Sequence, residues 1–549
     1  MQCLSNRLCS VSALLVLFAA GMAIAQPPVP AKVATGYHAI RESDLRADLG
    51  FLSSDALQGR MSLTKGDEVA VQWIAAEFAK AGLKPAFGSS FLQTVPVIEY
   101  RADRAQSYLR LQRGGTAKQL QFPDVLGGFK HDVDVTADVV FAGFGITAPE
   151  LGYDDYAGLD ARGKIVLVFD HEPQETDAAS VFNGTGNTRY ATTRVKALNA
   201  QAHGALALLL VAEPNRKHLS NQERQAHIGG SATRKLPPPS QALAEDELNI
   251  PVAIVTDPIA RELMQTSGVT PAEAQTVIDR DLKPQSRPLP DTQMEFHFRN
   301  AYAHPGTTWN VAGILEGSSP ELRAETIIIS AHHDHDGETE EGIWHGADDN
   351  GSGTVGVVEL ARAFATNQQK PKRSILFVVF AAEERGLLGA YYLAAHPVRP
   401  LATTRAMINF DMIGRNEAPS QQTEGLLQIP ADTTNRLNLI GGMYSPEYRH
   451  TVEAQNRFVG LVLDDRFDHE SALNVFFRSD QFPFVLHNVP AFWWFTGFHP
   501  DYHHITDTAD RINYPKMARI LQLAYLSAWQ FGDEAQGPKF VENPKGSAK

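Results

Sequence analysis

Cysteine is almost absent from this chain of 549 residues: the only two are Cys3 and Cys9, close to the N-terminus. Both lie inside a segment that we expect to be removed on export, so the mature chain would contain no cysteine. Such a chain can form no disulfide, has no thiolate nucleophile and cannot bind zinc through Cys ligands. It also avoids mispaired disulfides in an oxidising compartment.

Positive charge and long apolar runs are also scarce. The chain has 49 Lys and Arg against 63 Asp and Glu, a formal net charge of -14. This balance argues against a nucleic-acid partner, because phosphate binding needs a basic face. No segment after the N-terminus has the unbroken apolar length of a transmembrane helix, so we expect no membrane span in the mature chain. Nothing in the sequence favours a particular oligomeric state.

The N-terminus has the pattern of a secretory signal. "MQCLSNR" carries one Arg, "VSALLVLFAAGMA" is an apolar core, and Ala23-Ile24-Ala25 fits the small-residue cleavage rule. A membrane anchor is the alternative, but the apolar run is short and Gln26-Pro27-Pro28 interrupts it. The pattern predicts a signal peptide over residues 1–25, cleavage after Ala25, and export to the periplasm or the medium.

Changes in residue composition and hydrophobic pattern divide the rest of the chain into segments. Residues 26–134 begin with a helical pattern in which Val69, Trp73, Ile74 and Phe78 share one stripe. Residues 135–285 alternate strand and helix patterns and predict a compact β-rich or α/β insert, followed by a Pro-rich linker at 282–293. Residues 286–536 alternate apolar strands with helices, which predicts an α/β fold with a mostly parallel, twisted sheet covered by helices. Residues 537–549 are predicted to be a flexible tail.

Polar side chains follow each apolar strand of the last large segment. "ETIIISA" runs into "HHDHDG", "SILFVVFAA" into "EERG" and "AMINF" into "DMIG", while "HPDYHHITDT" follows "VPAFWWFTG". Between the first two strands lies "HGADDNGSG". Because ligands of open α/β sheets bind beyond the carboxyl ends of the strands, we expect these groups to meet in one crevice.

These side chains are imidazoles and carboxylates without any thiolate. Such a set suits zinc in a catalytic site, or manganese or cobalt. A bridging Asp could hold two ions about 3.5–4 Å apart, and a Glu beside a ligand Glu could serve as general base. Each motif alone could be a solvated loop or an acidic helix start. Five of them at successive strand ends favour a metal site.

The motifs "AHHD", "GADDNGSG", "AAEE", "NFDM" and "YHHITDT" together resemble those of the co-catalytic zinc aminopeptidases, relatives of bacterial leucyl aminopeptidase and glutamate carboxypeptidase. "LSSDALQGR" resembles the N-terminal lead-in of that family, and "GYDDYAGLDARGKIVLV" and "KALNAQAHGALALLLV" resemble an inserted protease-associated domain. The resemblance implies a zinc exopeptidase fold, a protease-associated domain at 135–285, a catalytic domain at 286–536, two Zn²⁺ ions (Mn²⁺ or Co²⁺ as alternatives) and peptide substrates that lose N-terminal residues.

The resemblance also implies roles for single residues. Glu383 matches the general base, and Asp348 matches the carboxylate that bridges the two ions, with a cis peptide between Asp348 and Asp349. The implied metal ligands are His332, Asp348, Glu384, Asp411 and His503. The implied outer residues, which would orient these ligands without touching metal, are Asp334, Asp349 and Asp507.

Some assignments keep an alternative. His333 could replace His332, and His504 could replace His503, although the spacing to Asp507-Thr508 selects His503. Further histidines, namely His335, His345 and His499, are expected near the mouth of the site, in contact with solvent or with the ligands. The run "FWWF" (492–495) is expected to be a core strand.

Other functions are also compatible with the motifs. A carboxypeptidase, dipeptidase or glutaminyl cyclase of the same fold is one class, and a carboxypeptidase would need a cationic pocket for which Arg415 and Arg478 are candidates. A catalytically inactive binding protein is the other class, since a fold does not guarantee activity. Such a protein should have lost a ligand or the base, whereas all are present here.

Overall fold

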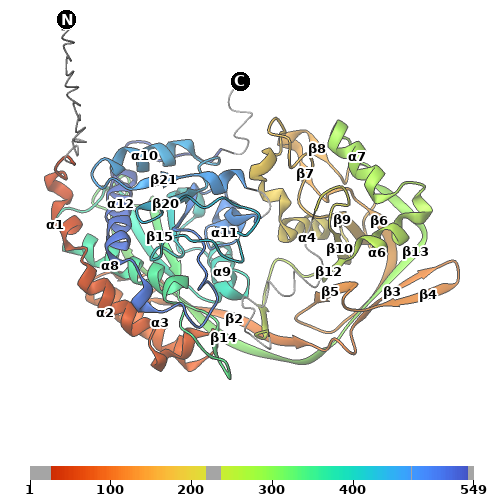
Figure 1. Cartoon of the computed structure of the whole chain (residues 1–549), viewed down its shortest axis with the longest axis horizontal. Helices are drawn as coiled ribbons and strands as arrows, with labels where there is room; N and C mark the ends of the chain where they lie inside the picture. The colour runs from red at the N-terminus through yellow and green to blue at the C-terminus, as the bar shows by residue number, and fades with distance from the viewer. Residues whose placement is uncertain (1–25, 218–236, 471–472, 542–549) are drawn as a thin grey trace, which may run out of the picture.

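The computed structural model describes residues 26–217, 237–470 and 473–541, which form two lobes joined by two long strands (Figure 1). The predicted signal peptide lies outside the described residues, so its cleavage stays a prediction. Within the described part of the chain, no helix has both the length and the apolar character needed to cross a membrane.

The larger lobe is built on a mixed sheet with the strand order β11-β2-β14-β18-β15-β19-β22-β20-β21. Its central strands β18, β15, β19 and β22 are parallel to one another, as predicted, while antiparallel strands flank them. The strands are β2 (Leu92–Ala102), β11 (Ser240–Leu243), β14 (Asn300–Leu315), β15 (Thr326–His332), β18 (Ser374–Phe380), β19 (Thr404–Phe410), β20 (Arg436–Ile440), β21 (Val462–Asp464) and β22 (Ala491–Phe495), with β1 (Lys84–Pro85) beside β14.

Helices cover both faces of this sheet (Figure 1). One face packs against α1 (Ala31–Ala39), α2 (Glu42–Leu52), α3 (Lys65–Lys80), α8 (Gly353–Thr366), α10 (Pro446–Asn456) and α12 (Tyr514–Asp533). The other face packs against α9 (Leu388–Ala395) and α11 (Phe482–Val485). Every residue of β15, β18 and β22 is buried, which explains their uninterrupted apolar runs and confirms "FWWF" as a core strand.

The smaller lobe contains a second sheet with the order β4-β3-β13-β6-β9-β10-β12-β5. Its strands are β3 (Tyr108–Arg113), β4 (Thr116–Leu120), β5 (Val125–Gly128), β6 (Val133–Phe141), β9 (Ile165–Phe169), β10 (Ala207–Val211), β12 (Val252–Val255) and β13 (Arg287–Phe298). Helices α4 (Thr193–Ala202), α6 (Asp257–Met264) and α7 (Pro271–Asp281) belong to the same lobe (Figure 1). A separate two-stranded sheet, formed by β7 (Thr147–Ala148) and β8 (Tyr153–Asp154), completes this lobe. A second two-stranded sheet, formed by β16 (Gly337–Thr339) and β17 (Gly342–Trp344), lies between the motifs "AHHD" and "GADDNGSG" of the chain.

The limits of this lobe differ from the predicted insert at 135–285. Strand β13 covers most of the stretch expected to be a linker, because it pairs with β3 on one side and β6 on the other. Strand β11, although inside the predicted insert, pairs with β2 in the first sheet. Long-range strand pairing, which the local Pro content does not reveal, decides both limits.

Two smaller expectations were also wrong. Val69 on α3 is 37% exposed, whereas Ile74 and Phe78 of the same predicted stripe are buried, together with Ala70. The start of the predicted flexible tail is packed: the Phe540 ring stacks on Tyr444, and the Val541 amide donates to the Tyr444 carbonyl.

Candidate metal centre

The strands of the central sheet bring the predicted residues together at one edge. Strand β15 ends at His332, β18 leads into the turn η7 (Glu383–Arg385), and Asp411 follows β19. The loop that contains His503 follows β22. Since these four strands are parallel neighbours in the sheet, their carboxyl ends, and the side chains behind them, converge as expected.

The first group of potential ligands surrounds His332. Its Nε2 atom is buried, has no hydrogen-bond partner within the described residues, and lies 3.6 Å from each of Asp349 Oδ1, Glu383 Oε2 and Asp411 Oδ1. These distances exceed a hydrogen bond. They fit an ion held between the atoms, because tetrahedral zinc with bonds of 2.0–2.2 Å separates its ligand atoms by about 3.4 Å.

The second group surrounds His503. Its Nε2 atom lies 3.1 Å from Asp349 Oδ2 and 3.4 Å from Glu384 Oε2. On the other side of the ring, Nδ1 is 3.0 Å from Asp336 Oδ2, an arrangement that holds the ring and the tautomer of a metal-binding histidine. Asp349 therefore presents one oxygen to each histidine, as a carboxylate that bridges two ions would.

Asp349, and not the predicted Asp348, occupies the bridging position. The Asp348 carboxylate accepts hydrogen bonds from Gly414 N (2.6 Å) and Ser352 Oγ (3.0 Å), and its second oxygen is 3.2 Å from His499 Nε2. The predicted cis bond between Asp348 and Asp349 is also wrong, because the cis peptide joins Asp349 to Asn350. Two adjacent aspartates look alike in sequence, and only the path of the turn η6 (Ala347–Ser352) decides which one faces the histidines.

Two of the predicted outer residues hold backbone turns. Asp507 accepts hydrogen bonds from Asp348 N and Asp349 N at 2.9–3.1 Å, so it orients the bridging aspartate. The Asp334 carboxylate accepts from Glu383 N at 2.9 Å and Glu384 N at 3.3 Å. His332 Nδ1 contacts the Asp334 carbonyl oxygen at 3.2 Å, while the carboxylate is 3.7 Å away. Asp334 therefore orients the imidazole through its backbone carbonyl and not through its carboxylate.

The structure also decides between the alternative histidines. The His333 ring points away from the cluster, with Nδ1 2.8 Å from Asp67 Oδ1 and Nε2 3.0 Å from the Trp309 carbonyl. His503 rather than His504 lies in the cluster, and no group of close potential ligands in the described chain contains His504.

Sequence reasoning missed Asp336 and Arg60 at this site, whereas it did expect His335 near the mouth, in contact with solvent or with the ligands. His335, expected near the mouth, is buried with Nδ1 2.7 Å from Glu384 Oε1. Asp336 supports His503. Arg60 is fully buried, and its guanidinium donates to the carbonyls of Leu52, His333, His345 and Gly346. The lead-in motif "LSSDALQGR" was the signal for Arg60, and the density of acids and histidines in "AHHDHDG" was the signal for Asp336.

The two adjacent glutamates have different electrostatic environments. Burial raises the pKa of Glu383 well above its ordinary value. Burial also raises the pKa of Glu384, but His503 and His335 outweigh it and lower that pKa to about 2. Glu384 is thus held as an ionised ligand, whereas Glu383 is suited to exchange a proton.

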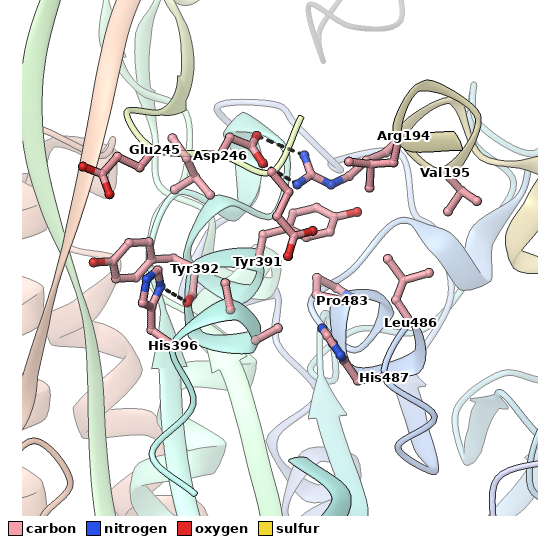
Figure 2. Close-up of a pocket in the computed structure, with 15 residues that line it drawn as sticks. Arg194, Val195, Glu245, Asp246, Tyr391, Tyr392, His396, Pro483, Leu486 and His487 are labelled. Carbon is pink, nitrogen blue, oxygen red and sulfur yellow. Dashed lines mark hydrogen bonds and ion pairs between the residues drawn. The ribbon is translucent and has the colours of Figure 1, made fainter. Parts of the chain in front are cut away.

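A cavity of about 540 Å³ opens onto Glu383 and Glu384. The larger lobe contributes Gly386, Leu387, Tyr391, Phe477, Arg478 and Tyr502, and the second, smaller lobe contributes Thr193, Arg194 and Leu248. Figure 2 shows a neighbouring cavity of about 270 Å³ that shares Arg194 and Tyr391 with it. Arg194 on α4 pairs with Asp246 at 2.5 and 3.1 Å and lies over the Tyr391 ring at 4.0 Å (Figure 2). The second lobe therefore forms one wall of the site.

Buried carboxylates and imidazoles clustered beside a cavity are the ligand types of a metallohydrolase centre. Comparison with known proteins agrees: residues 310–527 match Peptidase family M28, and residues 135–263 match the PA domain. The match to Peptidase family M28 thus falls on the segment that carries the centre, and the match to the PA domain falls mostly on the smaller lobe.

Individual relatives match parts of the chain. Leucine aminopeptidase 2 of Arthroderma otae is 30% identical over 263 residues, which cover 44% of this chain and 47% of the relative. A probable zinc metalloprotease of Pyrenophora teres f. teres is 34% identical over 156 residues, covering 26% and 33%. The chain thus spans about half the length, or less, of these curated relatives. An aminopeptidase of Aneurinibacillus sp. strain AM-1 aligns with a TM-score of 0.48 and 19% identity over 92% of this chain and 96% of that one.

Proposed function

We propose that the chain is an exported aminopeptidase that uses two zinc ions to remove N-terminal residues from peptides. The observation that carries this proposal is Asp349, whose two oxygens lie 3.6 Å from His332 Nε2 and 3.1 Å from His503 Nε2. One ion would be held by His332, Asp349 and Asp411, and the other by Asp349, Glu384 and His503. The names of the relatives, a leucine aminopeptidase and a zinc metalloprotease, support the choice of zinc and of reaction.

When bound, the ion pair would acidify a water molecule and polarise the scissile carbonyl. Glu383 lines the cavity and accepts the proton of the attacking water, then returns it to the amine that leaves. The Asp334 carboxylate accepts hydrogen bonds from the backbone amides of Glu383 and Glu384, so the base and the neighbouring ligand are held in a fixed position relative to each other. In this proposal, the wall formed by Thr193, Arg194 and Leu248 of the second lobe selects substrates by size.

The ligand assignment is tested by a matched pair of variants, Asp349→Asn and Asp348→Asn. We expect Asp349→Asn to lose bound zinc and activity, because one carboxylate serves both ions. Asp348→Asn should keep zinc in the metal analysis, since its carboxylate contacts Gly414, Ser352 and His499 instead. The reverse outcome would restore Asp348 as the bridge.

The reaction is tested with Glu383→Gln and a substrate panel. Glu383→Gln should keep its zinc and lose activity by about 10²–10⁴-fold, the usual contribution of a general base. The wild-type protein should release the first residue of aminoacyl anilides and of peptides with free N-termini, and should not cleave N-blocked peptides. Cleavage of N-blocked peptides with free C-termini would favour a carboxypeptidase, and cyclisation of N-terminal Gln would favour a glutaminyl cyclase. Export is tested by N-terminal sequencing of the mature protein, which should begin at Gln26.

A further inference from the structure

Arg478 lies on the wall of the cavity beside Glu383 and Glu384, and within the described part of the chain its guanidinium has no ion-pair partner. It is half-buried and lines the cavity together with Glu383 and Glu384. Among the described residues it forms no ion pair, and its side chain donates no hydrogen bond. Its guanidinium carbon lies 5.5 Å from the centre of the Phe498 ring.

The other arginines near the centre are engaged. Arg194, the second arginine of the same cavity, is held by Asp246. Arg415, the other sequence candidate for a cationic pocket, pairs with Asp501 at 2.6 Å and lies 3.8 Å from Asp507. A guanidinium that lines a cavity without an ion pair to a protein acid is available to bind an anionic group of a ligand.

The position of Arg478 is tied to the metal centre. Its backbone amide donates to the Val475 carbonyl at 3.0 Å, and the next residue, Ser479, donates through Oγ to Asp411 Oδ2 at 2.6 Å. The ring of Phe498 restricts the guanidinium on one side. The backbone of Arg478 is therefore tied to the metal centre, and its guanidinium lies on the wall of the cavity that would contain the scissile bond.

We propose that Arg478 forms a carboxylate-binding subsite of the catalytic cavity, so that the preferred substrates are short peptides with a carboxylate close to the scissile bond. This inference rests on the proposed peptidase function. The planar guanidinium binds a carboxylate through two parallel hydrogen bonds. The carboxylate can come from the C-terminus of a dipeptide or from an acidic first side chain.

The test measures binding and not turnover, in the zinc-loaded protein with the Glu383→Gln substitution, so that the ligand is not consumed. Isothermal titration calorimetry compares the dipeptide Leu-Leu with Leu-Leu-amide, and Glu-Leu-amide with Gln-Leu-amide. Each pair is repeated after Arg478→Gln and after Arg478→Lys. The matched control is Arg457→Gln, which removes an exposed arginine from the face of Phe458 outside the cavity.

We expect removal of the carboxylate to weaken binding about tenfold with Arg478 present, in line with a hydrogen-bonded charged group. With Arg478→Gln the difference should disappear, Arg478→Lys should restore part of it, and Arg457→Gln should leave it unchanged. A difference confined to the Leu-Leu pair identifies the C-terminal carboxylate, and one confined to the Glu/Gln pair identifies the side chain. Zinc content and thermal unfolding of each variant exclude loss of folding.

Equal affinities within both pairs in the presence of Arg478, or a difference that persists after Arg478→Gln, would overturn the subsite. The failure of the proposed function appears separately, as absence of hydrolysis by the protein with Glu383 intact, and leaves these binding constants measurable.

Discussion

Arg60 offers a test of how the N-terminal segment supports the metal centre. Its guanidinium donates four hydrogen bonds, at 2.6–2.9 Å, to the carbonyls of Leu52, His333, His345 and Gly346. His333 follows the ligand His332 directly, and Gly346 lies three residues before Asp349. Burial lowers the pKa of Arg60 to about 10, against the opposing effect of nearby aspartates, so the group is charged at neutral pH.

The size of the effect follows from these contacts. Hydrogen bonds to a charged group contribute about 1.5–3 kcal/mol each, so four give roughly 6–12 kcal/mol. The desolvation of a buried guanidinium offsets several kcal/mol of this sum. We therefore expect Arg60→Gln to lower the free energy of unfolding by about 4 kcal/mol, within the 3–5 kcal/mol typical of a broken buried charge network. Arg60→Lys should lose about half as much, because one ammonium cannot reach carbonyls on opposite sides.

Tryptophan fluorescence during urea unfolding is the appropriate assay. All six tryptophans, at positions 73, 309, 344, 493, 494 and 529, lie in the catalytic lobe, so the signal reports on that lobe alone. We also expect zinc affinity to fall by about 10–100-fold, as for other residues that orient metal ligands. The control is Arg46→Gln, which removes an exposed arginine from the Tyr514 ring on the neighbouring helix α2. An unchanged urea midpoint together with unchanged zinc affinity in Arg60→Gln would refute the reasoning.

Three further predictions concern zinc and the PA domain. Removal of zinc by a chelator should lower the unfolding temperature, and zinc at 1,000 times its Kd should restore about 4 kcal/mol of the free energy of unfolding. An unfolding temperature that does not change with zinc would argue against a zinc site in the folded protein. Arg194→Ala should change KM for peptides roughly tenfold with zinc content unchanged, because it removes a charged contact in the cavity wall and none at the ligands; zinc loss with unaltered KM would contradict this. Burial raises the pKa of Glu172 to about 8, above about 4.3 in the unfolded chain, so the stability that it contributes falls as the pH rises through that window. The free energy of unfolding of Glu172→Gln, measured by calorimetry, should therefore rise relative to that of the wild type by up to about 1.4 kcal/mol per pH unit between pH 5 and 8. A difference in this free energy that stays constant with pH would refute the raised pKa of Glu172.

Local sequence determined much of the catalytic lobe. The apolar runs at β15, β18, β19 and β22 identify buried parallel strands, because a strand covered on both faces has no polar alternation. The polar residues directly after these runs then had to meet at one edge of the sheet. For this reason the sequence alone places His332, Glu383, Glu384 and Asp411 together.

Tertiary structure decided between residues that their position and spacing in the sequence cannot distinguish. Asp348 and Asp349 share one local sequence, and the turn that places Asp349 between the histidines is held by Asp507, more than 150 residues away in the chain. Arg60 donates hydrogen bonds to the same loops from a position still farther away in the chain. Strand β13 joins the second sheet by pairing with residues 108–113 and 133–141. Each outcome depends on hydrogen bonds between distant segments, whose partners exist only once the chain has folded.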